Sequence, residues 1–204
     1  MARLPQYKDH TPQFGRKWHL RFTGPLEQIL TRFRGQPNLR YLEIGVWEGL
    51  SMYWMHCNVL TDPSTKSYAI DPWLDAEGEQ RYQRTLHNLS PWKEKIQILR
   101  GTSRQVLMSG RFQDQSFDII YIDGDHIAPA ALQDLVLTWG LLKDNGLMIF
   151  DDYMPYAENP KLLAPSLGAD AFLNLYRGHF IIPMTPKVSG QLYLIKTGTT
   201  PSLG

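Results

Sequence analysis

Short apolar segments that carry an acidic residue at or next to the carboxyl end constrain this chain more than any other feature. Arg40–Ile44, Tyr68–Ile70, Phe117–Ile122 and Leu147–Phe150 have the length and composition of buried strands. Helical patterns separate them, and this alternation predicts parallel βαβ units with helices on both faces of one sheet. Ligands of such sheets bind outside the carboxyl ends of the strands. The acidic residues are therefore expected to meet at one crevice.

Further elements complete the expected fold. Ile96–Leu99 is predicted to be another strand. Near the end, His179–Met184 and Gln191–Lys196 flank a turn around Pro186–Gly190, and two strands joined so closely must be antiparallel. The prediction is an α/β, Rossmann-like, doubly wound and mostly parallel seven-stranded sheet with a C-terminal antiparallel hairpin. Helices are expected at Leu26–Arg34, Gly49–Leu60, Ala76–Leu89, Ser103–Met108, Pro129–Leu142 and Ala169–Tyr176.

Composition favours one globular domain with no strongly charged partner. The 204 residues, 43% of them hydrophobic, suffice for one core, and we divide them into an N-terminal arm and helix (1–36) and one domain (37–204). Lys and Arg total 21 against 20 Asp and Glu, which argues against a nucleic-acid partner. A single cysteine, Cys57, fits a reducing cytoplasm. No apolar run reaches the roughly 20 residues that span a bilayer, so a soluble protein without a membrane partner is expected.

The segment after the first strand has the form of a nucleoside-binding turn. It reads Glu43-x-Gly45-x-x-x-Gly49, where Gly45 permits a sharp turn and Gly49 opens a helix whose N-terminus faces the ligand. Trp47 is too large for the second glycine position of a dinucleotide fold. An acidic residue before the turn also suits a cationic ligand better than a pyrophosphate. An ordinary strand-to-helix turn is the alternative.

The next two strand ends add candidate nucleoside contacts. Asp71 ends the second strand, where a carboxylate can accept both hydroxyls of a ribose. Trp73 is a candidate cover for an adenine face, with a core tryptophan as the alternative. Thr102 and Ser103 follow the third strand and are either contacts to the adenine edge or a helix N-cap. Three such turns in this order predict a nucleoside cofactor.

Two later strand ends carry a candidate metal site. Asp123 follows one strand, and Asp151 and Asp152 follow the other. Like charges at such distances resist joint ionisation, and carboxylate oxygens suit Mg²⁺, with Ca²⁺ or Mn²⁺ as alternatives. Helix or turn capping by one or two of the aspartates is the other interpretation. His126 is a candidate general base for a substrate hydroxyl, and Asp125 is either the rival base or a support for His126.

In these residues the chain resembles class I S-adenosylmethionine-dependent methyltransferases. From Leu39 to Lys196, the acidic glycine turn, the ribose aspartate, Tyr-Ile-Asp-Gly-Asp-His and Phe-Asp-Asp-Tyr stand in the family's order. The last two segments are similar to those of small metal-dependent O-methyltransferases, of the catechol type and of the sugar-modifying type found in macrolide and aminocoumarin pathways. The resemblance implies cofactor contacts by Glu43, Gly45, Gly49, Ser51, Asp71, Trp73, Thr102, Ser103 and Asp123, and Mg²⁺ ligation by Asp123, Asp151 and Asp152.

Two positions distinguish between the branches of that family. The catechol type has a lysine base three residues after the first metal aspartate, where this chain has His126. It also has an asparagine after the second metal aspartate, where this chain has Asp152. Both departures match the sugar-modifying pattern. The resemblance assigns no role to the residues from 153 to 167 or to the N-terminal arm, and both segments are expected to cover the crevice where the substrate is chosen.

Together these features predict an enzyme that moves the methyl group of S-adenosylmethionine to a hydroxyl of a small molecule, a sugar or a phenol, with Mg²⁺ or another divalent cation. A metal-independent methyltransferase of the same fold is one alternative. An NAD-dependent oxidoreductase is another, although the Tyr-x-x-x-Lys pair of short-chain dehydrogenases is absent. A non-catalytic nucleoside-binding module is the third. A homodimer is an open alternative to a monomer.

Overall fold

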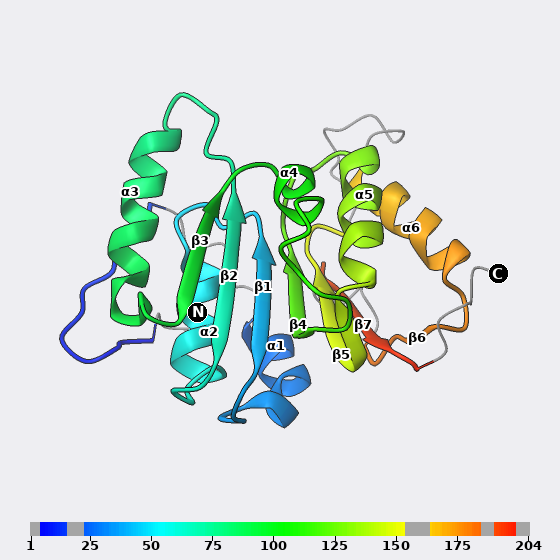
Figure 1. The fold of residues 1–204 in the computed structure, drawn as a ribbon, viewed down its shortest axis with the longest axis horizontal. Helices are drawn as coiled ribbons and strands as arrows, with labels where there is room; N and C mark the ends of the chain where they lie inside the picture. The colour runs from blue at the N-terminus through cyan, green and yellow to red at the C-terminus, as the bar shows by residue number, and fades with distance from the viewer. Residues whose placement is uncertain (1–4, 16–22, 154–163, 185–189, 199–204) are drawn as a thin grey trace. The chain divides into compact units, whose positions relative to one another are not determined.

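The computed structural model describes residues 5–15, 23–153, 164–184 and 190–198 (Figure 1). The chain divides into two compact units, Met1–Thr102 and Ser103–Gly204. Along the seven-stranded sheet, the strand order reads β3-β2-β1 through the first unit and β4-β5-β7-β6 through the second. The predicted α/β class and mostly parallel seven-stranded sheet with an antiparallel C-terminal hairpin are confirmed. The proposed boundary between an arm and a domain at residue 36 stays a prediction.

The first unit is a parallel three-stranded sheet with helices between its strands. Its register pairs Leu42 with Tyr68 and Ile70 with Leu99. Leu42, Ile70 and Leu99 in these strands are buried, as expected for the core of a parallel sheet. The elements are α1 (Thr23–Ile29), η2 (Thr31–Phe33), β1 (Arg40–Ile44), α2 (Leu50–Asn58), β2 (Lys66–Asp71), α3 (Gly78–Leu89), η3 (Ser90–Trp92) and β3 (Ile96–Arg100).

The first helix differs from its predicted bounds. It runs over Thr23–Ile29 and is followed by a separate 3₁₀ turn, where the sequence predicted one helix over Leu26–Arg34. The hydroxyl of Thr31 donates 2.8 Å to the carbonyl of Glu27, and such a bond competes with continuation of the α-helix. The predicted end at Arg34 is therefore wrong for the α-helix, and Gly35, with a left-handed φ of 68°, follows the 3₁₀ turn.

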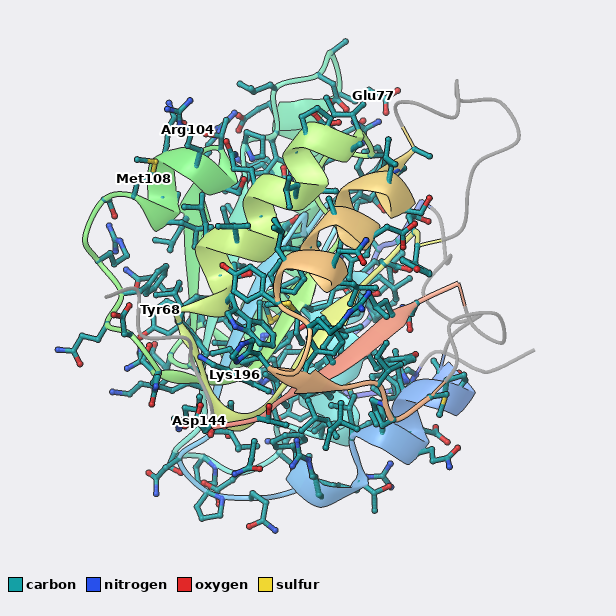
Figure 2. The ribbon with its side chains drawn as sticks, turned by 90° about the vertical axis from the view of Figure 1, so that its right-hand side faces the viewer. Tyr68, Glu77, Arg104, Met108, Asp144 and Lys196 are labelled. Atoms are coloured by element: carbon teal, nitrogen blue, oxygen red, sulfur yellow. The ribbon has the colours of Figure 1, made fainter. Side chains whose placement is uncertain are left out.

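The second unit combines a parallel strand pair with an antiparallel end. β4 and β5 are parallel, β7 is antiparallel to β5, and β6 is antiparallel to β7. Helices α5 and α6 lie side by side (Figures 1 and 2). No helix of the described residues is long and apolar enough to cross a membrane. The elements are α4 (Ser103–Leu107), β4 (Phe117–Ile122), α5 (Ala128–Trp139), β5 (Leu142–Phe150), α6 (Pro165–Leu175), β6 (Phe180–Ile181) and β7 (Leu192–Lys196).

The fifth strand begins earlier than predicted. Helix α5 ends at Trp139, and β5 already begins at Leu142, so the expected helix end at Leu142 is wrong. Residues 143–146 form a bulge in β5. Phe117 of β4 pairs with Leu142, but Ile119 pairs with Leu147, so the register shifts between these two pairs. Lys196, only 2% exposed, donates 3.0 Å to the carbonyl of Trp139 and 2.8 Å to that of Leu142. The first bond satisfies a carbonyl that the end of α5 leaves open, and the second binds the first residue of β5.

The C-terminal elements also differ in length from the prediction. Helix α6 begins at Pro165, four residues before the predicted start at Ala169, because proline is tolerated in the first turn. Strand β6 covers only Phe180–Ile181 and not His179–Met184, and Pro183 lacks the N–H that a longer ladder needs. Residues 154–163 and 185–189 lie outside the described residues. They contain most of the segment expected over the crevice and most of the predicted hairpin turn.

Candidate active site

The loop that joins β1 to α2, residues 45–49, has three left-handed positions and is called the glycine loop below. Gly45 and Gly49 have φ values of 82° and 81°, which glycine adopts without strain. A Cβ at Gly49 would lie 3.1 Å from a side-chain carbon of α3, so this position also requires close approach. Trp47 has a φ of 54°, which is unfavourable for a bulky residue. Other contacts must therefore hold the loop in this conformation.

Asp71, at the end of β2, holds the glycine loop. Its Oδ2 accepts the backbone N–H of Trp47 at 2.9 Å, its Oδ1 accepts that of Trp73 at 2.8 Å, and the N–H of Val46 also bonds to the carboxylate. Burial raises the pKa of Asp71, and these three backbone bonds partly oppose the rise. Ribose binding by Asp71 stays a prediction, and fixing the loop is a second role that the sequence did not indicate.

Trp73 lies against the same loop. Its side chain is 5% exposed, and its indole N–H donates 2.8 Å to the carbonyl of Trp47. Its ring contacts the ring of Tyr82, with 4.9 Å between the centroids. This burial agrees with the core interpretation of Trp73. Its predicted contact with adenine stays a prediction.

Glu43 lies behind the glycine loop and is completely buried. Its Oε2 accepts the hydroxyl of Tyr41 at 2.6 Å, and its Oε1 accepts the hydroxyl of Ser51 in α2. Burial raises the pKa of Glu43 to about 7, the two hydroxyl bonds oppose the rise, and the charge of Asp71 adds to it. Glu43 therefore ties β1 to the start of α2. The predicted cofactor contacts of Glu43 and Ser51 remain untested.

At the start of α4, the side chain of Ser103 hydrogen-bonds the carboxyl group of Asp134 in α5. Asp134 is 3% exposed, and burial raises its pKa to about 6, helped by the charge of Asp125 and opposed by Ser103. Sequence reasoning missed Asp134. The only signal in the sequence was the spacing of Asp134, which places it on the same face of α5 as the buried residues Ala131 and Thr138. Adenine contacts by Ser103 and by Thr102 of the first unit stay predictions.

In the second unit, Asp123, His126 and Asp152 lie together. Each offers one ligand atom, and these atoms all lie within 4.8 Å of one another. His126 Nδ1 is 3.0 Å from Asp152 Oδ2. Asp152 has a left-handed φ of 56°, which directs it differently from an ordinary strand residue. Two carboxylates and an imidazole suit a divalent cation, so the donor chemistry fits the predicted metal.

The third predicted metal ligand, Asp151, has different surroundings. It is 8% exposed, its Oδ2 accepts the hydroxyl of Tyr121 at 2.6 Å, and its Oδ1 accepts the N–H of Asp152 at 2.9 Å. Gln191 donates 2.8 Å to the Tyr121 oxygen and accepts the hydroxyl of Tyr193 at 2.6 Å. Burial is the main cause that raises the pKa of Asp151. This buried chain of side chains was not predicted, and metal ligation by Asp151 stays a prediction.

Comparison with known proteins identifies the class. Residues 42–153 match a family described as a methyltransferase domain, and this match covers more than half of the chain. The chain therefore belongs to the methyltransferase-domain family. The resemblance to S-adenosylmethionine-dependent methyltransferases is confirmed, and the family implies S-adenosylmethionine as the methyl donor.

Individual relatives are distant. An uncharacterised protein of Acanthamoeba polyphaga mimivirus is 28% identical over 152 residues, which cover 74% of this chain and 66% of that relative. A putative O-methyltransferase from Klebsiella pneumoniae has 18% identity and a TM-score of 0.61, over 91% of this chain and 83% of that one. MycE methyltransferase from the mycinamycin biosynthetic pathway, solved with Mg, S-adenosylhomocysteine and mycinamycin VI, has 18% identity and a TM-score of 0.60. The similarity extends over 89% of this chain and 52% of the MycE chain. These structures share the fold.

Proposed function

We propose that this methyltransferase moves the methyl group of S-adenosylmethionine to a hydroxyl of a small molecule, with help from a divalent cation. The observation that carries the proposal is the group of Asp123, His126 and Asp152 within a methyltransferase domain. The catalytic roles assigned below to these three residues, and to Asp125 and Asp151, are part of the proposal.

Asp123 and Asp152 would hold the cation through their carboxylate oxygens. A bound divalent cation supplies a Lewis acid, which lowers the pKa of an acceptor hydroxyl. The residues of the chain then receive the proton. When His126 donates from Nδ1 to Asp152, its Nε2 carries the lone pair, and this nitrogen would take the proton from the hydroxyl. Asp125, exposed and one residue before His126, is the alternative base.

The cofactor would be held by the glycine loop and the residues around it. Glu43 and Asp71 place two carboxyl groups at neighbouring strand ends, which suits a cationic sulfonium ligand and a ribose. Ser51 stands at the start of α2, where N–H groups face a ligand. Because Asp71 already binds loop N–H groups, the ribose would use its remaining lone pairs.

For the acceptor, we propose the hydroxyl of a sugar or a phenol. MycE, with the same fold, comes from a mycinamycin pathway, and another structure with this fold is described as a TDP-rhamnose 3'-O-methyltransferase (TM-score 0.57, 14% identity). His126 and Asp152 support the sugar branch, because both match its pattern. A cytoplasmic location is also part of the proposal, and a homodimer stays an open alternative to a monomer.

Calorimetry and a turnover screen test the proposal. We expect S-adenosylhomocysteine to bind and NAD to give no heat. Mn²⁺ should bind to the native protein and to Asp114→Asn, which removes an exposed carboxylate of the same unit, but more than tenfold more weakly to Asp152→Asn. Consumption of S-adenosylmethionine with sugar and catechol acceptors should stop with EDTA and return with Mg²⁺. Turnover unaffected by EDTA would establish the metal-independent alternative, and absence of nucleoside binding would refute the cofactor assignment.

A further inference from the structure

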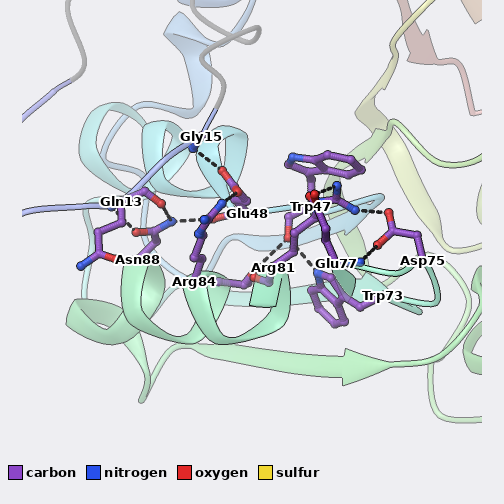
Figure 3. A network of polar contacts seen from close by, with 11 residues as sticks. Gln13, Gly15, Trp47, Glu48, Trp73, Asp75, Glu77, Arg81, Arg84 and Asn88 are labelled. Carbon is purple, nitrogen blue, oxygen red and sulfur yellow. Dashed lines mark hydrogen bonds and ion pairs between the residues drawn. The ribbon is translucent and has the colours of Figure 1, made fainter. Parts of the chain in front are cut away.

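Glu48, inside the glycine loop, connects this loop to the N-terminal arm. Its side chain is almost completely buried, and the residue is 3% exposed. Oε1 accepts Arg84 Nη1 from α3 at 2.5 Å, and Oε2 accepts the backbone N–H of Gly15 at 2.6 Å (Figure 3). A buried carboxylate needs both a charge partner and hydrogen bonds. The arm therefore supplies one of the hydrogen bonds that stabilise the buried carboxylate of Glu48.

Asn88, at the end of α3, joins the same two segments. Its Oδ1 accepts the backbone N–H of Gln13 at 2.6 Å, and its Nδ2 donates 2.9 Å to the carbonyl of Gln13 and 2.8 Å to that of Glu48 (Figure 3). Asn88 is completely buried. Two of its three hydrogen bonds therefore depend on the arm, and the third fixes the backbone of the glycine loop.

Aromatic contacts hold the rest of the arm on the same surface. The N–H of Tyr7 bonds to the hydroxyl of Tyr53 in α2 at 3.3 Å, and its ring lies 4.5 Å from that of Trp92. Phe14 contacts Tyr53 edge-on, with 5.6 Å between centroids. Tyr53 is completely buried. Polar and apolar contacts thus agree that residues 5–15 are docked on α2 and α3.

Gly15 is fitted closely into this arrangement. A Cβ at this position would lie 3.2 Å from Glu48 Oε1 and 3.3 Å from Arg84 Nη1. Both distances are shorter than ordinary van der Waals contact, so even a methyl group would push the carboxylate or the guanidinium away. At Gly24, by contrast, a Cβ would meet nothing within 4 Å.

We propose that Glu48, Arg84 and Asn88 form a docking site for the arm, and that docking positions the glycine loop for the cofactor. We call these three residues the arm cluster, and they act as positioning residues. Release of the arm removes one hydrogen bond from the Glu48 carboxylate and two from Asn88, both buried. Without the arm, the carboxylate of Glu48 keeps its bond to Arg84 but loses the one from Gly15, so the glycine loop loses part of what holds it in this conformation. By linkage, cofactor binding and arm docking favour each other. The inference rests on the proposed binding of S-adenosylmethionine at this loop.

Gly15→Ala and its control Gly24→Ala test the inference. For both variants, hydrogen exchange of residues 5–15 and the affinity for S-adenosylhomocysteine are measured. We expect Gly15→Ala to accelerate exchange of the arm and to weaken S-adenosylhomocysteine binding about tenfold, the loss of one charge-assisted hydrogen bond. Gly24→Ala should change neither. Addition of S-adenosylhomocysteine to the native protein should slow exchange of the arm by a similar factor.

The outcomes separate the inference from the proposed function. Faster arm exchange with unchanged affinity would overturn the coupling, and unchanged exchange in Gly15→Ala would overturn the docking role of the arm cluster. If the native protein did not bind S-adenosylhomocysteine, the proposed cofactor site and the coupling would both fail. A native protein that binds the nucleoside while Gly15→Ala binds it equally well would leave the proposed function intact and refute only the inference.

Discussion

Replacement of Glu43 by glutamine should make the stability of the fold less dependent on pH. Burial raises the pKa of Glu43 from its ordinary 4.5 to about 7. The folded state therefore holds a proton that the unfolded state releases between these values, and the stabilising contribution of Glu43 is complete below pH 4.5 and is lost as the pH rises through 7. A shift of 2.5 pH units at 1.36 kcal/mol per unit corresponds to about 3 kcal/mol.

Urea unfolding at pH 5 and pH 8 measures this effect. The free energy of unfolding of Glu43→Gln, relative to the native protein, should rise by up to about 3 kcal/mol between the two pH values. Glutamine retains the shape and one acceptor oxygen for Tyr41 or Ser51. Glu94→Gln, which removes an exposed carboxylate, is the matched control and should show no such rise. An equal difference between Glu43→Gln and the native protein at both pH values would refute the reasoning.

Two substitutions of buried polar residues and one change of pH provide further tests. Tyr121→Phe removes the hydroxyl bonded to Asp151 and should lower the free energy of unfolding by about 1–3 kcal/mol in urea titrations, and an unchanged midpoint would contradict this. Lys196→Met leaves the carbonyl of Trp139 without its donor and should also lower the free energy of unfolding by about 1–3 kcal/mol. An unchanged urea midpoint would contradict this expectation. Burial and the nearby His87 charge lower the pKa of His10, so arm docking should be complete above pH 6.5 and weaken as the pH falls. The protection of the arm amides, measured as the ratio of the intrinsic to the observed exchange rate at the same pH, should therefore be lower at pH 5 than at pH 7.5. This decrease in protection should be smaller in His10→Gln.

The positions of the central strands were predictable because each is a local apolar run. Phe117–Ile122 and Arg40–Ile44 have the bounds that the sequence predicted. The start of β5 was not predictable in this way. Residues 143–146 are the polar and glycine residues of a typical turn, and they belong to the strand only through the bulge opposite β4. That arrangement depends on the partner strand, which local composition does not describe.

The part of the candidate site that lies directly at the ends of strands was predictable from the sequence. Asp123, His126 and Asp152 were expected together, and their ligand atoms are within 4.8 Å. The partners of buried groups were not predictable, because they are distant in the sequence. Glu48 and Gly15 are separated by 33 positions. Nothing near either residue indicates that one accepts a hydrogen bond from the other.

The two adjacent aspartates at the end of β5 illustrate the same limit most sharply. By sequence alone, Asp151 and Asp152 are equivalent carboxylates. Both follow the last residue of β5, Phe150, and the left-handed φ of 56° at Asp152 gives the second carboxylate a direction that differs from that of a strand residue. Here Asp151 accepts the buried hydroxyl of Tyr121, and Asp152 approaches His126. The bond from Tyr121 occupies only Oδ2 of Asp151, and Oδ1 accepts only the N–H of Asp152, so the carboxylate keeps lone pairs beyond these two bonds. Local sequence therefore does not distinguish the two carboxylates, and their different partners become apparent only in the fold.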